Sequence, residues 1–232
     1  ESILLEAARD AGHALADCQL QSGGWDYVLE FDPNERHRWA FRSSSTPPAS
    51  KAKNVTTLDD DTTQSALRFL MKLDKVLEFQ DQKIHSATEY ALSCLLKAQY
   101  PNGAWPQRFS EFPLPADFPV LKASYPESWS RTYPKLDYRS YYTFNDDTLA
   151  DMIDTMFLAA EIYSDKTYET AARRAGDFIL LAQMPEPQPA WAQQYNAQMN
   201  PAWARRFEPA SVTGGESQGV IRILLKLYSR TG

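Results

Sequence analysis

The chain has 232 residues, of which 43% are hydrophobic and 23% are charged, the composition of an ordinary soluble globular protein. Its net charge of −6 argues against a general nucleic-acid-binding surface, although a local arginine cluster or a bound cation could still attract an anionic ligand. No apolar run approaches the roughly 18 residues that a membrane helix needs, so we expect no membrane partner.

Hydrophobic periodicity predicts six helices along the chain. Their ranges are 2–18, 60–77, 83–98, 147–163, 167–182 and 216–229. In the fourth, Leu149, Met152, Ile153 and Met156 recur at the spacing of a buried helix face. Sustained period-two alternation is absent, so the sequence predicts an all-α fold class without a sheet. The two cysteines, Cys18 and Cys94, lack metal-type spacing and are interpreted as buried thiols.

An internal repeat ends the first, third and fifth predicted helices. QLQSGGW (19–25) and QYPNGAW (99–105) share the pattern Gln-x-x-x-Gly-x-Trp and lie 80 residues apart. QMPEPQPAW (183–191) is a looser copy, with proline in place of glycine and two additional residues. Glycine and proline commonly end helices, so each copy marks a helix C-terminus.

A second motif starts the helix that follows each tryptophan copy. Its copies are TLDDDT (57–62), TFNDDT (143–148) and the weaker TGGES (213–217). Three such units of about 80 residues predict an (α/α) toroid or barrel of three helical-hairpin repeats with long loops, one domain over residues 1–232. If the helices that begin with acidic residues run parallel as an inner ring, their N-termini meet at one end. The stretch from Pro106 to Tyr142 is too long for a bare connector and predicts an ordered loop wall.

Two of these helix starts are crowded with carboxylates. A single aspartate would be explained as a helix cap, which the helix dipole favours. Adjacent carboxylates repel each other, and the crowding occurs at two repeat-related positions. Ca²⁺ readily takes Asp and Asn oxygens, whereas zinc is not expected because the three histidines lie away from both clusters. Capping and cation binding both remain open at this point.

Aromatic and basic residues also have two interpretations each. Trp25, Trp105 and Trp191 are interpreted chiefly as structural plugs, with a sugar-stacking platform as the alternative. Aromatic residues of the loop wall are better candidates for sugar contact, namely Trp129, Tyr133, Tyr138, Tyr141 and Tyr142.

Two pairs of adjacent arginines stand out. Arg173 and Arg174 lie within a predicted helix and are interpreted as part of a solvated face. Arg205 and Arg206 lie between two aromatic residues, just before the third inner helix, where a functional role is as well supported as a structural one.

Four segments, in this order, resemble the motifs of family 10 polysaccharide lyases, the pectate lyases with an (α/α) toroid. They are AQYPNGAWPQRF, YYTFNDDTLADM, LLAQMPEPQPAWAQQYN and WARRFEPASVTGGES, within a resemblance that runs from SGGWDY to GGESQGV. The resemblance implies Ca²⁺-dependent cleavage of polygalacturonate (pectin) by anti β-elimination in a secreted or periplasmic setting. We expect the protein to act as a monomer.

The resemblance also implies site residues. TLDDDTT is similar to the family's Thr-(Leu/Ile)-Asp-Asn-Gly-Ala-Thr, with Asp60 in place of asparagine and Asp61 in place of glycine. TFNDD is similar to the second family cluster and makes Asp146 the best Ca²⁺ ligand. The implied metal ligands are Asp146, Asp59 and Asp60, and the implied catalytic residues are Arg205, as the base, and Asp59. The implied substrate-binding residues are Asn145, Arg206, Trp105 and Arg108.

Elimination must remove the C5 proton of a uronate, which becomes acidic when the adjacent carboxylate is neutralised by Ca²⁺. Arginine, with a pKa above about 12, serves as the base only if it also stabilises the anion and the reaction runs at alkaline pH.

One alternative is an inverting glycoside hydrolase that uses Asp59 and Asp146, with carboxyl groups roughly 6.5–9.5 Å apart. Another is a non-catalytic pectin-binding protein. Family members continue past LLKLYSRTG into a segment with further arginines, which we expect this chain to lack or to have elsewhere.

Overall fold

Six α-helices form the frame of the protein in the computed structural model, which describes residues 2–45 and 47–232. They are α1 (Ile3–Asp17), α2 (Thr62–Val76), α3 (Gln82–Ala98), α4 (Thr148–Tyr163), α5 (Lys166–Ala182) and α6 (Gly214–Thr231). All six predicted helices are confirmed, because the periodic apolar positions of each one face the common core. The all-α fold class is likewise confirmed.

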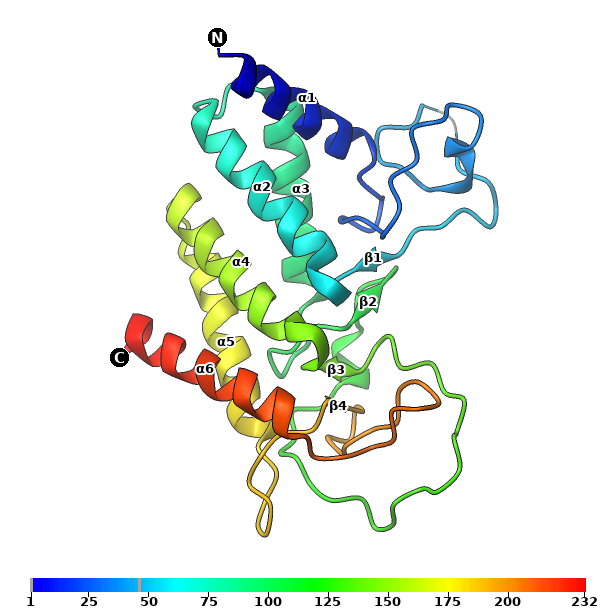
Figure 1. The fold of residues 1–232 in the computed structure, drawn as a ribbon, viewed down its shortest axis with the longest axis vertical. Helices are drawn as coiled ribbons and strands as arrows, with labels where there is room; N and C mark the ends of the chain where they lie inside the picture. Colours follow the sequence, from blue (N-terminus) through cyan, green and yellow to red (C-terminus); the bar gives the residue numbers. More distant parts are fainter. Residues whose placement is uncertain (1, 46) are drawn as a thin grey trace.

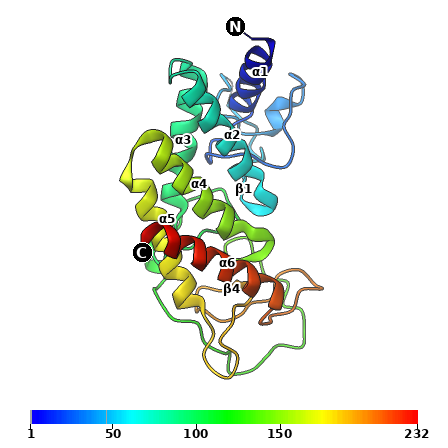
Figure 2. The same cartoon turned by 60° about the vertical axis from the view of Figure 1, so that its left-hand side comes forward.

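The helices form two rows. Helices α1, α2, α4 and α6 follow one another in contact, while α3 packs on α1 and α2, and α5 packs on α4 and α6. Figures 1 and 2 show α1 and α6 at the two ends of this arrangement. Helices α2, α4 and α6 all begin on the side that carries the long loops (Figure 1), as the repeat predicts. Among the described residues, no helix combines the length and apolar character required to cross a membrane.

The motif tryptophans plug the joints between hairpins. Trp25, Trp105 and Trp191 are 1%, 0% and 4% exposed. Each indole Nε1 donates a 2.8 Å hydrogen bond to a carbonyl of the preceding helix, ten residues earlier for Trp25 and Trp105 and twelve for Trp191. The two additional residues of the third copy therefore lie within the turn. The structural role of the three motif tryptophans is confirmed. The assignment of Trp105 as a substrate-binding residue is wrong, because no sugar can reach a fully buried ring.

The glutamine that begins each tryptophan motif makes hydrogen bonds that hold the turn in place. Gln19 Nε2 donates to the carbonyl of its own motif glycine at 2.9 Å and to that of Ala87 in α3 at 2.8 Å. Gln99 Nε2 does the same at 2.9 Å each, reaching Ala171 in α5. Gln19 and Gln99 therefore each tie their turn to the next outer helix, whereas Gln183 Nε2 donates to Pro189 within its own turn. Gly103 has a φ of +95°, and an added Cβ would lie 1.9 Å from a carbonyl oxygen of α5, so only glycine fits.

The paired arginines of α5 differ in their contacts, although both are exposed. Arg173 pairs with Glu169 at 2.7 Å on the solvated face. Arg174 Nη2 instead donates to the carbonyls of Tyr100 at 3.1 Å and Pro101 at 3.3 Å, which holds the second tryptophan motif against α5. The solvated-face interpretation is therefore incomplete for Arg174.

Among the residues that the structure describes, four short strands correct the prediction that the domain has no sheet. β1 (Thr56–Thr57) pairs with β2 (Arg108–Phe109), and β3 (Tyr142–Thr143) pairs with β4 (Gln194–Tyr195), both antiparallel. Strands of two residues cannot show alternation, so no sequence pattern announces them. Each pair joins the segment before an acidic motif to the segment after the next tryptophan motif. Segments far apart in the sequence are thereby brought to the same end of the helices.

The loop wall between Pro106 and Tyr142 is mostly irregular but anchored. The backbone nitrogen of Ala123 donates to the carbonyl of Leu181 at 2.7 Å, and other backbone hydrogen bonds tie the wall to neighbouring loops. Trp129 is 44% exposed and remains available for sugar contact. Tyr142 is 1% exposed, so its inclusion among the sugar-contact candidates is wrong.

We expect Trp105→Ala to destabilise the protein by about 3–5 kcal/mol, because it removes a fully buried aromatic side chain and its hydrogen bond. Thermal unfolding followed by circular dichroism should show a lower midpoint, and Trp105→Phe, which keeps most of the packing, should lose less. Unchanged stability together with weakened pectate binding would contradict the structural role.

A buried carboxylate links α2, α3 and α4 at the end away from the acidic motifs. Asp74 is fully buried, and its Oδ2 lies 2.9 Å from His85 Nδ1 and accepts a 2.8 Å hydrogen bond from the Tyr163 hydroxyl. The hydrogen bond to Asp74, with a smaller contribution from the charge of Glu89, raises the pKa of His85. A raised histidine pKa contributes stability that is complete below the unfolded-state pKa of about 6.5 and is lost as the pH rises through the folded-state pKa.

We therefore expect His85→Asn to lower the free energy of unfolding more at mildly acidic pH than at alkaline pH. Urea unfolding at several pH values measures this difference. A pH-independent loss would mean that His85 contributes only by packing and neutral hydrogen bonding.

Candidate active site

Each acidic motif folds into one 3₁₀ turn ahead of its helix: η2 (Asp59–Asp61) before α2 and η4 (Asn145–Asp147) before α4. The second and third residues of both turns have left-handed backbone conformations. Their φ angles are 50° and 57° in η2, and 51° and 54° in η4. Left-handed backbone is uncommon outside glycine, although Asp and Asn tolerate it best. Strain repeated at two equivalent places is typical of functional sites.

The acids do not serve as ordinary caps. Asp61 and Asp147 occupy the N-cap positions, yet neither makes a side-chain capping hydrogen bond. The threonine that begins each helix donates its hydroxyl hydrogen to the carbonyl of the first turn residue, over 2.9 Å in η2 and 2.8 Å in η4. Asp61 instead pairs with Arg68 at 2.5 Å. Capping therefore does not account for the crowded carboxylates.

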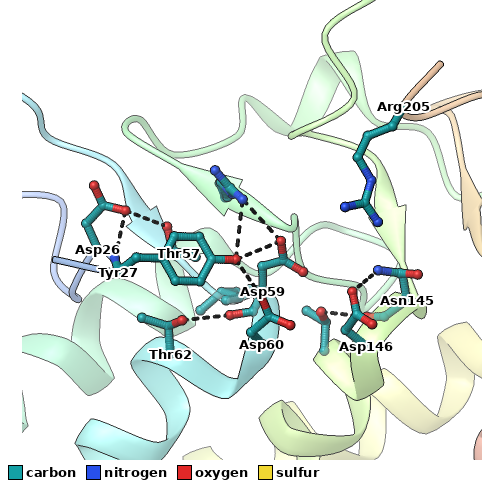
Figure 3. Close-up of polar contacts among 12 residues, drawn as sticks. Asp26, Tyr27, Thr57, Asp59, Asp60, Thr62, Asn145, Asp146 and Arg205 are labelled. Carbon is teal, nitrogen blue, oxygen red and sulfur yellow. Dashed lines mark hydrogen bonds and ion pairs between the residues drawn. The ribbon is translucent and has the colours of Figure 1, made fainter. Parts of the chain in front are cut away.

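Three carboxylates from the two turns meet in space. One oxygen each of Asp59, Asp60 and Asp146 lies within 4.8 Å of the others (Figure 3). Asp59 is 8% exposed, and its Oδ1 is buried without a hydrogen-bond partner in the described part of the chain. Burial raises the pKa of Asp146, and the charges of Asp59 and Asp60 raise it further. Several hard oxygen donors, one of them buried and unpaired, fit a cation such as Ca²⁺.

Tyr27 and Arg108 contact the acids that η2 contributes to this cluster. The Tyr27 hydroxyl lies 2.9 Å from Asp59 Oδ2 and 2.9 Å from Asp60 Oδ2. Arg108 Nη2, from β2, donates to Asp59 Oδ2 at 3.1 Å, and its guanidinium lies over the Tyr27 ring at 5.1 Å. A cavity of about 360 Å³ opens beside Arg108, lined largely by the loop wall. Arg108 is therefore placed where the cluster meets open space.

A chain of hydrogen bonds connects the cluster to Arg205. Arg205 Nε and Nη2 donate to both oxygens of Glu208 at 2.6 and 2.5 Å. Gln193 Nε2 donates to Glu208 Oε1 at 3.2 Å and to Asn145 Oδ1 at 2.5 Å. Asn145 in turn donates from Nδ2 to Asp146 Oδ2. Figure 3 shows the Arg205 guanidinium directed toward Asn145 and Asp146.

The charges along this series of hydrogen bonds keep Arg205 positively charged. The hydrogen bond to Glu208 raises the pKa of the Arg205 guanidinium, and the charges of Glu208 and Asp146 raise it further. Reciprocally, Arg205 holds the pKa of Glu208 below its usual range and partly offsets the raised pKa of Asp146. Arg205 and Asp146 therefore interact electrostatically across the site.

The structure gathers most of the predicted site residues. Asp59, Asp60, Asp146, Asn145 and Arg108 lie together, and Arg205 faces them. Arg206 is exposed beside Arg205, with no side-chain contact to the cluster among the described residues. The third repeat contributes no acid to this cluster, because Thr213, Gly214 and Gly215 occupy its helix start, and Glu216, in the first turn of α6, is not among the carboxylates that meet.

Sequence reasoning missed Tyr27, Gln193 and Glu208. A signal for two of them exists: Tyr27 and Gln193 each lie two residues after a motif tryptophan. The pairing of β3 with β4 brings Gln193 to η4, whereas Tyr27 lies outside the strands and reaches η2 through its side chain. Glu208 has no such signal.

The sequence matches the family described as pectic acid lyase over residues 19–231. Among solved structures, a family 10 polysaccharide lyase from Cellvibrio cellulosa matches with a TM-score of 0.65 and 24% identity, covering 96% of this chain and 63% of that one. An Asp-to-Ala mutant of the Cellvibrio cellulosa lyase, in complex with trigalacturonic acid, matches with the same score and identity, covering 96% and 64%. The chain therefore spans less than two thirds of the length of these structures. None of the curated proteins matches the sequence significantly.

Proposed function

The chain belongs to the pectic acid lyase family, and on this premise we propose that it cleaves polygalacturonate by Ca²⁺-assisted anti β-elimination. The observation that carries the proposal is the meeting of Asp59, Asp60 and Asp146 within 4.8 Å, with Arg205 facing them. A solved structure of similar fold holds trigalacturonic acid, which supports the same class of substrate here. Polygalacturonate is a polymer of plant cell walls, so an enzyme that cleaves it is expected to act in a secreted or periplasmic setting.

The proposed reaction breaks two bonds of the polymer. The base takes the C5 proton, the C5–H electron pair forms the C4–C5 double bond, and the C4–O bond to the leaving sugar breaks. The leaving oxygen takes a proton from solvent. Negative charge develops next to the uronate carboxylate, so groups that stabilise this charge lower the barrier.

We propose that Asp59, Asp60 and Asp146 hold the cation. The buried, unpaired Oδ1 of Asp59 and the raised pKa of Asp146 support this assignment, since both features favour a positive ligand. When bound there, Ca²⁺ would neutralise the substrate carboxylate and make the C5 proton more acidic. Asn145 would orient Asp146 through their hydrogen bond, and Arg108 would bind a substrate carboxylate at the mouth of the neighbouring cavity.

Arg205 is the proposed base. Its two hydrogen bonds to Glu208 fix the plane of the guanidinium, but the same carboxylate favours the charged form. The neutral guanidine is therefore scarce near neutral pH, and the rate should rise as the solution becomes alkaline. After it accepts the C5 proton, the guanidinium again carries a positive charge beside the developing anion.

The spacing of the acids argues against the inverting hydrolase. Oxygens of Asp59 and Asp146 lie within 4.8 Å, whereas an inverting pair needs about 6.5–9.5 Å between carboxyl groups to hold a water molecule. The spacing of the acids does not distinguish a lyase from a non-catalytic pectin-binding protein, so an experiment must separate these two functions.

An ultraviolet assay on polygalacturonate, with Ca²⁺ and then with a chelator, tests the proposal. Elimination should produce the absorbance of a conjugated unsaturated uronide, which the chelator should abolish and excess Ca²⁺ should restore. New reducing ends without absorbance would indicate hydrolysis. Pectate binding without either product would identify a binding protein.

A further inference from the structure

We infer that Tyr27 is a positioning residue for the acidic cluster, whose hydroxyl group holds the exposed carboxylate of Asp60 beside the buried carboxylate of Asp59. The inference rests on the proposed function and adds to it a residue outside both acidic motifs. Its basis is the geometry of one aromatic side chain between two carboxylates that belong to the same strained turn.

Asp59 and Asp60 are held by different means. Asp59 is nearly buried and also accepts a hydrogen bond from Arg108 at 3.1 Å. Asp60 is exposed, and in the described part of the chain Tyr27 provides the only hydrogen bond to its carboxylate, at 2.9 Å. With a left-handed backbone and an exposed side chain, Asp60 depends on Tyr27 for the direction of its carboxylate.

Tyr27 itself is anchored on two sides. Its backbone nitrogen donates to Asp26 Oδ1 at 2.8 Å, and the same oxygen accepts a 3.4 Å hydrogen bond from Thr57 in β1. The Arg108 guanidinium lies over the ring at 5.1 Å. Figure 3 shows the Tyr27 hydroxyl between the two carboxylates. The phenol is therefore fixed relative to the strand that leads into the acidic turn.

The chemistry of the contact leaves ligand atoms available. A hydroxyl group has one hydrogen, so Tyr27 donates to one carboxylate at a time while its oxygen stays close to both Oδ2 atoms. The second oxygen of each carboxylate is not used by Tyr27. In Asp59 this second oxygen is the buried, unpaired Oδ1. A hydrogen-bonded neighbour that orients a ligating carboxylate without competing for its free oxygen is typical of metal sites.

The second acidic turn also has a side-chain partner from outside its own motif. Gln193 donates to Asn145 in η4 at 2.5 Å, as Tyr27 contacts the acids of η2. Both residues follow a motif tryptophan by two positions. Tyr27 follows the first tryptophan motif and Gln193 the third, so the two contacts are not copies of each other, but each acidic turn has a side-chain partner two residues after a motif tryptophan.

Calorimetric titration of the metal-free protein with CaCl₂ tests the inference. Tyr27→Phe removes only the hydroxyl group from a ring that is 47% exposed, so the fold should remain intact. We expect its dissociation constant for Ca²⁺ to rise by about 10–100-fold, the usual cost of losing an orienting partner. Tyr90→Phe is the matched control, because it removes the hydroxyl group that donates to the carbonyl of Gln21 at 2.7 Å in another part of the fold. The control should bind Ca²⁺ as the parent does.

A double-mutant cycle with Asp60→Asn shows whether Tyr27 acts through Asp60. If it does, the double variant should bind Ca²⁺ about as weakly as Asp60→Asn alone. Parent-like Ca²⁺ affinity of Tyr27→Phe, or losses that multiply in the double variant, would overturn the inference while the lyase proposal stood. A parent that binds no Ca²⁺ would overturn the proposed metal site and this inference together.

Discussion

Asp146→Asn is expected to reduce Ca²⁺-dependent cleavage of polygalacturonate by several orders of magnitude while the helical circular dichroism signal stays unchanged. The carboxylate of Asp146 is the only acid that η4 contributes to the cluster with Asp59 and Asp60. Its loss leaves the proposed cation without a charged ligand from one of the two turns. Asparagine is preferable to alanine because it tolerates the φ of 51° at this position, whereas alanine adds backbone strain.

The stability of the same variant tests the electrostatic argument independently of activity. Burial and the neighbouring charges of Asp59 and Asp60 raise the pKa of Asp146 in the folded protein. A raised carboxylate pKa favours the folded state at low pH and disfavours it as the pH rises through the folded-state pKa. In chelator at neutral pH, Asp146→Asn should therefore unfold at the same temperature as the parent or a higher one.

Asp10→Asn, which changes an exposed aspartate of α1, is the matched control and should keep both activity and metal dependence. Full chelator-sensitive activity of Asp146→Asn would refute the assignment of Asp146 as a ligand. A markedly lower melting temperature in chelator would instead show that its charge stabilises the metal-free fold.

Arg205→Lys is expected to lower turnover by several orders of magnitude with substrate binding largely kept. Lysine preserves a positive charge but loses the planar fork that makes two hydrogen bonds to Glu208. If Arg205 acts mainly in the transition state, kcat should fall far more than KM rises. Arg173→Lys, at an exposed ion pair on α5, controls for the substitution itself. A fall confined to KM would make Arg205 a binding residue.

The dependence on pH gives the second part of this prediction. Below the pKa of the guanidinium, its neutral fraction rises about tenfold per pH unit, so the parent rate should rise correspondingly toward alkaline pH. Glu208 raises the pKa of Arg205, and Glu208→Gln should lower it toward the ordinary value. The dependence of the rate of Glu208→Gln on pH should then shift to lower pH, even if the maximal rate of this variant differs from that of the parent. A flat profile, or a shift to higher pH, would rule out Arg205 as the base.

Local patterns are sufficient to predict the helical frame. Apolar spacing and the Gly or Pro stops act within a few residues, so all six helices can be predicted. The repeat also carries long-range information, because equivalent helices of stacked units begin at the same end. Repetition alone therefore predicts that Asp59, Asp60 and Asp146 lie close together, and the three carboxylates do meet.

Contacts between distant segments decide the rest. The paired strands are two residues long, too short for any pattern, yet they bring Arg108 to Asp59 and Gln193 to Asn145. The left-handed turns are hidden in the sequence because aspartate rather than glycine occupies them.

Tertiary structure also chooses between interpretations that the residue types leave open. Trp105 could have been a plug or a platform, and only its complete burial in the common core makes it a plug. Tyr27 reaches Asp60 across 33 residues, a contact that neither residue's neighbours in the sequence announce. Helices follow from short-range periodicity, whereas the partners of a charged side chain follow from where the completed fold places them.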